Sequence, residues 1–308
     1  MTYQIATPVA ISKAFSPGHI TGFFRKFQSK NYLESGSTGA GISIKKGVTT
    51  IVEKYDSLHY DYDISLNGIN NYNGLVSKFV VKKYLQFLKT PVFLDIKHFT
   101  DIPIGYGIGS SGAAALSLSY ALNEVLNLKF DKYKVAQIAH LADLSCKTGL
   151  GSVITEFFGG FELRTSPGGP GVGTVKKIPL KGYKAIILCI SPLSTHEILS
   201  KNHLHIEPSI VDPMIERLKL SGDINEFLIM SNYFSETLNL THGVCKNAIL
   251  TLKNHGYNSS IALFGNTVFT VVPSDELKKV VDCLSSIDGQ LIISDIDDTG
   301  ASVLFHDE

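Results

Sequence analysis

The sequence contains no tryptophan, and it has only three methionines and four cysteines in 308 residues. The cysteines are far apart, and none has the CxxC or Cys/His spacing of a metal site. Cys189 and Cys283 lie in the apolar runs "AIILCI" and "VVDCL". We therefore expect neither a disulfide framework nor a zinc site, and we interpret these cysteines as small apolar residues in a reducing compartment.

Neither sign of charge is in excess, because 28 basic and 28 acidic residues give a formal net charge of zero. This balance does not indicate a nucleic-acid-binding surface. No apolar run approaches the roughly 18 residues that a membrane span needs, and the N-terminus lacks a basic segment followed by an apolar one. We expect a cytoplasmic protein whose partner is a small molecule rather than nucleic acid or membrane.

Hydrophobic periodicity predicts an α+β fold in which strands and helices do not strictly alternate. Expected strands are 48–55, 92–99, 185–190, 267–272 and 301–305, and expected helices are 75–88, 113–126, 132–146, 210–220, 224–238, 244–255 and 275–284. Asp131, Asp223 and Ser274 are candidate N-caps, and Gly256 is a candidate helix stop. The segment 164–183 is rich in Gly and Pro, which predicts a domain boundary near residue 180, with domains 1–180 and 181–308.

A glycine-rich turn, "PIGYGIGSSG", leads directly into the apolar helix predicted at 113–126. The N-terminus of a helix carries unpaired N–H groups and partial positive charge, so it suits a phosphate. Glycines let the backbone approach an anion closely, and hydroxyls can reach a phosphate or Mg²⁺. The residues expected to bind phosphate here, and ATP by the family resemblance given below, are Pro103, Gly105, Gly107, Ile108, Gly109, Ser110, Ser111, Gly112 and Ala113.

The residues around this turn do not fit two other nucleotide-binding motifs. The Walker pattern GxxxxGK[ST] is absent, because no lysine follows the glycines. The dinucleotide fingerprint does not fit either, because a loop containing Pro103 precedes the first glycine where a hydrophobic strand is needed. A turn that serves only close helix packing remains open on the glycine pattern alone.

The turn resembles the second motif of the GHMP kinases, Pro-x-x-x-Gly-Leu-Gly-Ser-Ser-Ala. The segment "KAFSPGHITGFF" (13–24) resembles their first motif, and "SSIALFGNTVFTVV" (259–272) stands where their third, glycine-containing motif occurs. The resemblance implies a two-domain α+β fold with ATP held between the domains. It also implies transfer of the γ-phosphoryl group of ATP to a hydroxyl of a small molecule.

Within that superfamily the sequence is most similar to the archaeal pantoate kinases, notably in "GSTGAGISIKKGV" (36–48) and "AHLADLSCKTGLGSVITEFFGG" (139–160). The resemblance implies that Ser111 and Asp143 bind Mg²⁺ and that Ser111, Asp143 and Ser152 form the catalytic group. It places His19, Thr21, His140 and Arg164 on the substrate side, where the planar fork of Arg164 suits a carboxylate or phosphate.

Two positions depart from the pantoate kinase pattern. Asp143 stands where Glu is usual, and Ser152 stands where Asp is usual and acts as a base; a serine hydroxyl cannot accept a proton at neutral pH. Arg25, Lys26 and Lys30 follow the first motif, and we expect Arg25 and Lys26 to contact the substrate.

Ser152 removes a carboxylate from the expected site, and Arg25, Lys26 and Lys30 add positive charge near it. Both changes favour an acceptor that already carries phosphate. We therefore expect mevalonate 3-phosphate as the acceptor, ahead of pantoate. A catalytically impaired homologue that senses a nucleotide or metabolite is a third interpretation. A homodimer is compatible with the sequence, which does not determine the oligomeric state.

Overall fold

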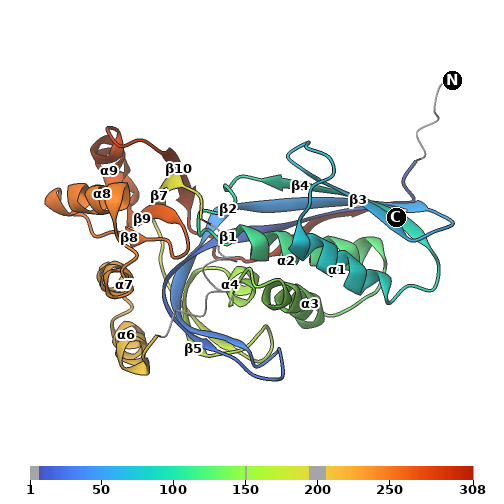
Figure 1. The fold of residues 1–308 in the computed structure, drawn as a ribbon, viewed down its shortest axis with the longest axis horizontal. Coiled ribbons are helices and arrows are strands. Elements are labelled where there is room, and N and C mark those ends of the chain that lie inside the picture. The colour runs from blue at the N-terminus through green and yellow to red at the C-terminus, as the bar shows by residue number, and fades with distance from the viewer. Residues whose placement is uncertain (1–6, 150, 194–205, 308) are drawn as a thin grey trace.

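The computed structural model describes residues 7–149, 151–193 and 206–307, which form two sheets and their covering helices (Figure 1). The larger sheet has seven strands, in the order β11-β1-β2-β4-β3, with β5 paired to β2 and β6 paired to β5. Only the β3–β4 pair is parallel among the described pairs of this sheet. Its strands are β1 (Ala10–Phe27), β2 (Gly36–Asp56), β3 (Asp61–Leu66), β4 (Val92–Thr100), β5 (Phe161–Ser166), β6 (Thr174–Ile178) and β11 (Ser302–Asp307).

The long β1–β2 hairpin bends, so that its two ends serve different parts of the molecule (Figure 1). The register between the strands shifts at Pro17/Gly18 and again at Thr21/Phe23. Such bulges increase the local twist and turn a strand. The first motif of the sequence therefore lies on the inside of a bend, facing the glycine-rich turn.

Four helices cover one face of the larger sheet: α1 (Leu75–Leu85), α2 (Ser110–Val125), α3 (Lys132–Ser145) and α4 (Ser152–Phe158) (Figure 1). Helix α2 lies at the centre and is buried on most of its surface, which explains its apolar sequence. The Asp131 side chain accepts hydrogen bonds from the N–H groups of Tyr133 and Lys134, which confirms it as the N-cap of α3.

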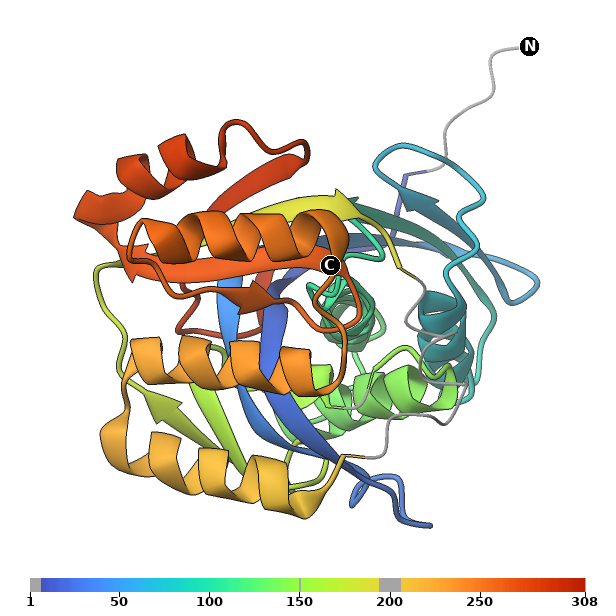
Figure 2. The same ribbon diagram turned by 60° about the vertical axis from the view of Figure 1, so that its left-hand side comes forward.

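The smaller sheet has the order β10-β7-β9-β8 and lies at the other end of the molecule (Figure 2). It consists of β7 (Tyr183–Ser191), β8 (Ser260–Ile261), β9 (Asn266–Pro273) and β10 (Gln290–Asp295), with α6 (Pro208–Ser221), α7 (Ile224–Thr237), α8 (Gly243–Asn254), η1 (Ser274–Glu276) and α9 (Leu277–Leu284). Helices α8 and α9 pack on this sheet through a separate apolar cluster. Phe227 of α7 packs on Phe23, Phe161 and Phe269, which joins the smaller sheet to the bent hairpin.

The α+β fold class is confirmed, and the main differences concern the segments near residue 180. The Gly/Pro-rich segment 164–183 contains the end of β5 and all of β6 rather than a plain loop. The smaller sheet begins at β7, close to the expected boundary, but β11 returns to pair with β1 in the larger sheet. Ser274 begins a short 3₁₀ helix and is not the N-cap of α9, whereas Asp223 caps α7 through the N–H of Glu226. No described helix is long and apolar enough to cross a membrane.

Candidate active site

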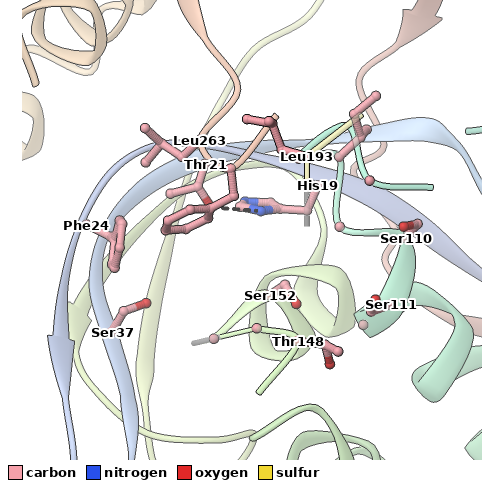
Figure 3. A pocket seen from close by; sticks show the side chains of 18 of the residues that line it. His19, Thr21, Phe24, Ser37, Ser110, Ser111, Thr148, Ser152, Leu193 and Leu263 are labelled. Atoms are coloured by element: carbon pink, nitrogen blue, oxygen red, sulfur yellow. Dashed lines mark hydrogen bonds between the residues drawn. The ribbon is translucent and has the colours of Figure 1, made fainter. Parts of the chain in front are cut away.

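A cavity of about 280 Å³ lies between the bent hairpin and the start of α2 (Figure 3). Parts of the chain far apart in sequence meet here: the first motif, the glycine-rich turn, the start of α4 and the third motif. The lining residues include His19, Thr21, Phe24, Ser37, Gly105, Gly107, Ile108, Gly109, Ser110, Ser111, Gly112, Thr148, Ser152, Arg164, Leu193, Leu263 and Phe264. The wall is mostly small polar groups at the helix and apolar side chains opposite.

The glycine-rich turn has the backbone that an anion site needs. Gly109 is the N-cap of α2 and has a left-handed conformation, with φ of 71°, which residues with a Cβ rarely adopt. Ser110 and Ser111 follow it in the first turn, with their side chains beside the cavity (Figure 3). The third motif packs directly on the turn, since a Cβ at Gly107 would lie 2.5 Å from the Leu263 carbonyl oxygen. The third motif therefore holds the turn on one side, and the first turn of α2, which begins there, borders the cavity.

A second cavity, of about 170 Å³, lies on the other side of the same helix start. It shares Ile104, Ser110, Ser111 and Thr148 with the first cavity. Its remaining wall comes from β2, β3, β4, α1, the segment before α1 and α2, and it includes Val48, Leu66, Tyr72, Asn73, Gly74, Leu75, Val76, Ser77, His98, Thr100 and Ala114. The two cavities therefore share the serines at the start of α2.

Asp143 lies behind the wall of the first cavity, with 1% of its side chain exposed. Its Oδ1 accepts a hydrogen bond of 2.8 Å from Thr148 Oγ1, and its Oδ2 accepts one of 3.3 Å from Ser152 Oγ. Burial raises the pKa of Asp143 to about 6, although these two hydrogen bonds act in the opposite direction. Both donors line the cavity, so the carboxylate reaches the site through them.

Glu156 is a second buried carboxylate, and sequence reasoning missed it. It is fully buried, and both of its oxygens lack a hydrogen-bond partner among the described residues. Burial raises the pKa of Glu156 well above its usual value, and the charge of Asp143 raises it further. A Cβ at Gly112 would lie 2.5 Å from both Glu156 Oε2 and Ser152 Oγ. Gly112 stands where the superfamily motif has Ala, and here Glu156 and Ser152 fill the space that a methyl group would occupy.

A buried ion cluster of His19, Glu162 and Arg164 closes the far end of the cavity. Glu162 Oε1 accepts a hydrogen bond of 2.5 Å from Arg164 Nη1 and lies 3.1 Å from His19 Nε2. Burial lowers the pKa of His19, and the charge of Arg164 contributes, although Glu162 opposes both effects. The neutral ring then donates from Nε2 to Glu162 and accepts at Nδ1 from Thr21 Oγ1, 3.4 Å away (Figure 3).

This geometry agrees with comparisons to known proteins. Residues 75–160 match the family model of the GHMP kinases N terminal domain. A pantoate kinase of Methanocaldococcus jannaschii is 31% identical over 282 residues, covering 88% of this chain and 97% of the relative. The chain belongs to the GHMP kinase family.

Two further similarities cover nearly the whole chain. A pantoate kinase of Thermococcus kodakarensis is 28% identical over 293 residues, covering 92% of this chain and 95% of the relative. A solved phosphotransferase related to the CoA biosynthesis pathway has a TM-score of 0.85 and 26% identity, and the match covers 96% of this chain and 98% of that one. The resemblance seen in the sequence is confirmed, and the protein is an ATP-dependent kinase that transfers phosphate to a hydroxyl.

The kinase brings most of the expected site residues together around the first cavity. His19, Thr21, Ser152 and Arg164 line it, as do the residues of the glycine-rich turn from Gly105 to Gly112 apart from Tyr106. Pro103 precedes this lining segment, and Ala113 is buried within the first turn of α2.

Three expected substrate contacts are absent from the described lining of the cavity. Arg25 is directed to the surface, where its Nη1 lies 2.6 Å from Asp212 Oδ2 and its guanidinium covers the Phe27 ring. Lys26 is exposed. His140 is fully buried, and its Nε2 lies 3.0 Å from the Ser35 carbonyl oxygen, so it holds the turn before β2. Successive side chains of a strand point to opposite faces, so Arg25 lies on the face opposite Phe24 of the cavity wall. Lys26 shares the face of Phe24 but lies farther along β1, where it is exposed.

Four lining residues were not among the expected site residues, although each lies in a segment that carries the family resemblance. They are Phe24, Ser37, Thr148 and Phe264, and only the fold brings them to one cavity. Phe264 has a φ of 67°, uncommon for an aromatic residue, and its ring packs against Phe24 at 5.7 Å. The sequence could have suggested Glu162 as a site residue, because it lies two residues before Arg164 on a strand and its side chain is therefore on the same face.

Proposed function

We propose that this kinase phosphorylates the primary hydroxyl of pantoate with ATP. Pantoate carries one carboxylate, a branched carbon and a terminal CH₂OH. The proposal is supported by the charge of the first cavity, where Arg164 is the one Lys or Arg side chain among the described lining residues. The pantoate kinases among its relatives, matched over nearly their whole length, support the same choice.

The two cavities suit the two reactants. The first holds Arg164 at one end and the aromatic pair Phe24 and Phe264 on its wall, which suits a carboxylate and a branched alkyl group. The second has apolar walls with amide, hydroxyl and imidazole groups, which suits a nucleobase. In this arrangement the phosphates of ATP lie across the N–H groups of the glycine-rich turn, between the two cavities.

Ser111 and Asp143 are the proposed ligands of Mg²⁺, which would neutralise charge on the ATP phosphates. Their oxygens fit this hard cation, and Glu156, whose two oxygens have no hydrogen-bond partner among the described residues, lies close to the same helix start. Asp143 is held behind Thr148 and Ser152, which favours a contact through water. Ser152 points its hydroxyl along the cavity wall and orients the acceptor hydroxyl, since phosphoryl transfer depends mainly on positioning and charge stabilisation.

Mevalonate 3-phosphate, expected first from the sequence, is less well matched than pantoate. It carries a phosphate in addition to its carboxylate, and such a molecule needs more positive charge than Arg164 paired with Glu162 provides. That expectation depended on Arg25 and Lys26, but Arg25 is engaged with Asp212 and Lys26 lies on the surface.

The test is ADP release and phosphorylated product measured with pantoate, mevalonate and mevalonate 3-phosphate side by side. We expect turnover of pantoate and at least about tenfold lower kcat/KM for the other two. The Arg164→Ala variant should raise the KM for pantoate by more than about 30-fold, because loss of a buried charge-assisted contact costs about 2–5 kcal/mol. Its KM for ATP should change little. Faster turnover of mevalonate 3-phosphate, or ATP hydrolysis without phosphorylation of any acceptor, would contradict the proposal.

A further inference from the structure

We propose that Glu162 selects the charge of the acceptor: it offsets the charge of Arg164, so that the site admits a carboxylate and disfavours a doubly charged phosphate group. The inference rests on the proposed function in one respect, the placing of the acceptor's anionic group at Arg164. It assigns to Glu162 a role in substrate discrimination rather than in chemistry. Glu162 is thus a specificity-determining residue that acts through Arg164.

The cluster is built from side chains that water does not reach. Glu162 is fully buried, Arg164 is 2% exposed and His19 is 1% exposed. Glu162 and Arg164 lie two residues apart on β5, so both point to the same side of the strand, toward His19 on β1. Glu162 Oε1 serves both partners, at 2.5 Å from Arg164 Nη1 and 3.1 Å from His19 Nε2.

The hydrogen bonds of the cluster are incomplete. Among the described residues, Glu162 Oε2 and Arg164 Nε have no hydrogen-bond partner. Arg164 lines the cavity, and the printed contact with Glu162 uses only Nη1, so its guanidinium keeps donors for a bound anion. The single contact with Glu162 therefore balances the charge of Arg164 without using all its donors.

Charge balance gives the selectivity. With His19 neutral, Arg164 and Glu162 together carry no net charge, so a bound carboxylate leaves the cluster with one negative charge and a phosphate dianion leaves two. The second negative charge must then lie near Glu162 in a space with little water. At a separation of about 5 Å and an effective dielectric constant near 20, one extra pair of like charges changes affinity by roughly two orders of magnitude.

A purely structural role for Glu162, in which it only orients Arg164, predicts something different. Loss of orientation of Arg164 would weaken the binding of carboxylates and phosphates alike and leave the ratio of their affinities unchanged. Charge selection predicts that the ratio changes. The Glu162→Gln variant separates the two, because its amide oxygen can still accept from Arg164 and His19 while the negative charge is gone.

The experiment measures binding by calorimetry at pH 8 with the nucleotide site filled by a non-hydrolysable ATP analogue and Mg²⁺. The probes are pantoate and the analogue in which a phosphonate replaces its carboxylate, followed by acetate and inorganic phosphate. We expect Glu162→Gln to raise the affinity for the phosphonate relative to pantoate by tenfold or more. Glu162→Asp retains the charge, and Glu53→Gln removes the same charge from the Glu53–Lys97 ion pair between β2 and β4. Both controls should keep the wild-type ratio.

The inference is overturned if the Glu162→Gln variant has the wild-type ratio of affinities for the phosphonate and pantoate, or if it loses affinity for both ligands equally. If that variant does not fold, the wild type still provides a test: it must bind pantoate more tightly than the phosphonate, and the reverse order overturns the inference. If pantoate is not turned over, the ratio of the affinities for inorganic phosphate and acetate tests the same inference. Failure of pantoate turnover alone therefore contradicts the proposed function and not the charge selection.

Discussion

Replacing Asp143 with asparagine should make the ligand-free protein more stable at neutral pH while impairing it as a kinase. Asp143 is 1% exposed, and in the folded protein burial raises its pKa from 3.8 to about 6. Between these values the folded state binds a proton that the unfolded state has already lost. Stability is therefore lost as pH rises through the window from 3.8 to about 6, the opposite of the usual behaviour of a paired carboxylate.

The size of the effect follows from the same two values. The rise in pKa corresponds to roughly 3 kcal/mol at pH 7, at about 1.4 kcal/mol for each pH unit. The asparagine amide can keep both contacts of the carboxylate: it can accept from Thr148 Oγ1 and donate to Ser152 Oγ, whose hydroxyl turns freely. The substitution therefore removes the buried charge without leaving a polar group unpaired, and most of the 3 kcal/mol should be gained.

The assay is urea unfolding of wild type and Asp143→Asn at pH 4, 5 and 7, without nucleotide or Mg²⁺. We expect the variant to be more stable by up to about 3 kcal/mol at pH 7 and by well under 1 kcal/mol at pH 4. The control variant Asp56→Asn removes an exposed carboxylate at the end of β2 and should show no such dependence on pH. An Asp143→Asn protein that is less stable than wild type at pH 7, or a difference that does not change with pH, would refute this account of the buried charge. Added Mg²⁺ and ATP should stabilise the wild type more than the variant.

Two further predictions concern the start of α2. Ser111→Ala should lower kcat for the phosphorylation of pantoate by about 100-fold, as loss of one preorganised contact to the reacting charge does, and should leave the unfolding midpoint close to wild type. Near-normal turnover in a coupled ADP assay would remove Ser111 from the magnesium site. Gly112→Ala restores the residue of the superfamily motif but should destabilise the protein by about 1–3 kcal/mol and weaken ATP binding, because the new methyl group meets Glu156 and Ser152. The double variant Gly112→Ala/Glu156→Ala should recover ATP binding, measured by calorimetry. A Gly112→Ala protein as stable as wild type would show that Glu156 and Ser152 do not fill the space beside Gly112.

The secondary structure was largely accessible from local patterns. The expected helices 132–146 and 224–238 correspond closely to α3 and α7, and their caps Asp131 and Asp223 were identified correctly, since capping depends on neighbours in the sequence. The hairpin β1–β2 was mostly missed. Its glycines and its apolar residues without clear alternation obscure the strand pattern, and its bend is set by pairing between strands rather than by either strand alone.

The sequence by itself determined the class of protein: the glycine-rich turn before an apolar helix predicts a phosphate site, and the order of three motifs identifies the kinase superfamily. It could also supply Ser111, Ser152 and Arg164, because these lie in motifs. Only the tertiary structure decided which charges face the cavity. Arg25 and Lys26 lie near the first motif in sequence, yet Arg25 pairs with Asp212 and Lys26 is exposed. The burial of Glu162 next to Arg164 and of Glu156 next to Gly112 became visible only in the fold. The physical reason is that burial and the distances between charges depend on segments far apart in sequence, and these quantities set the balance of charge that an acceptor meets.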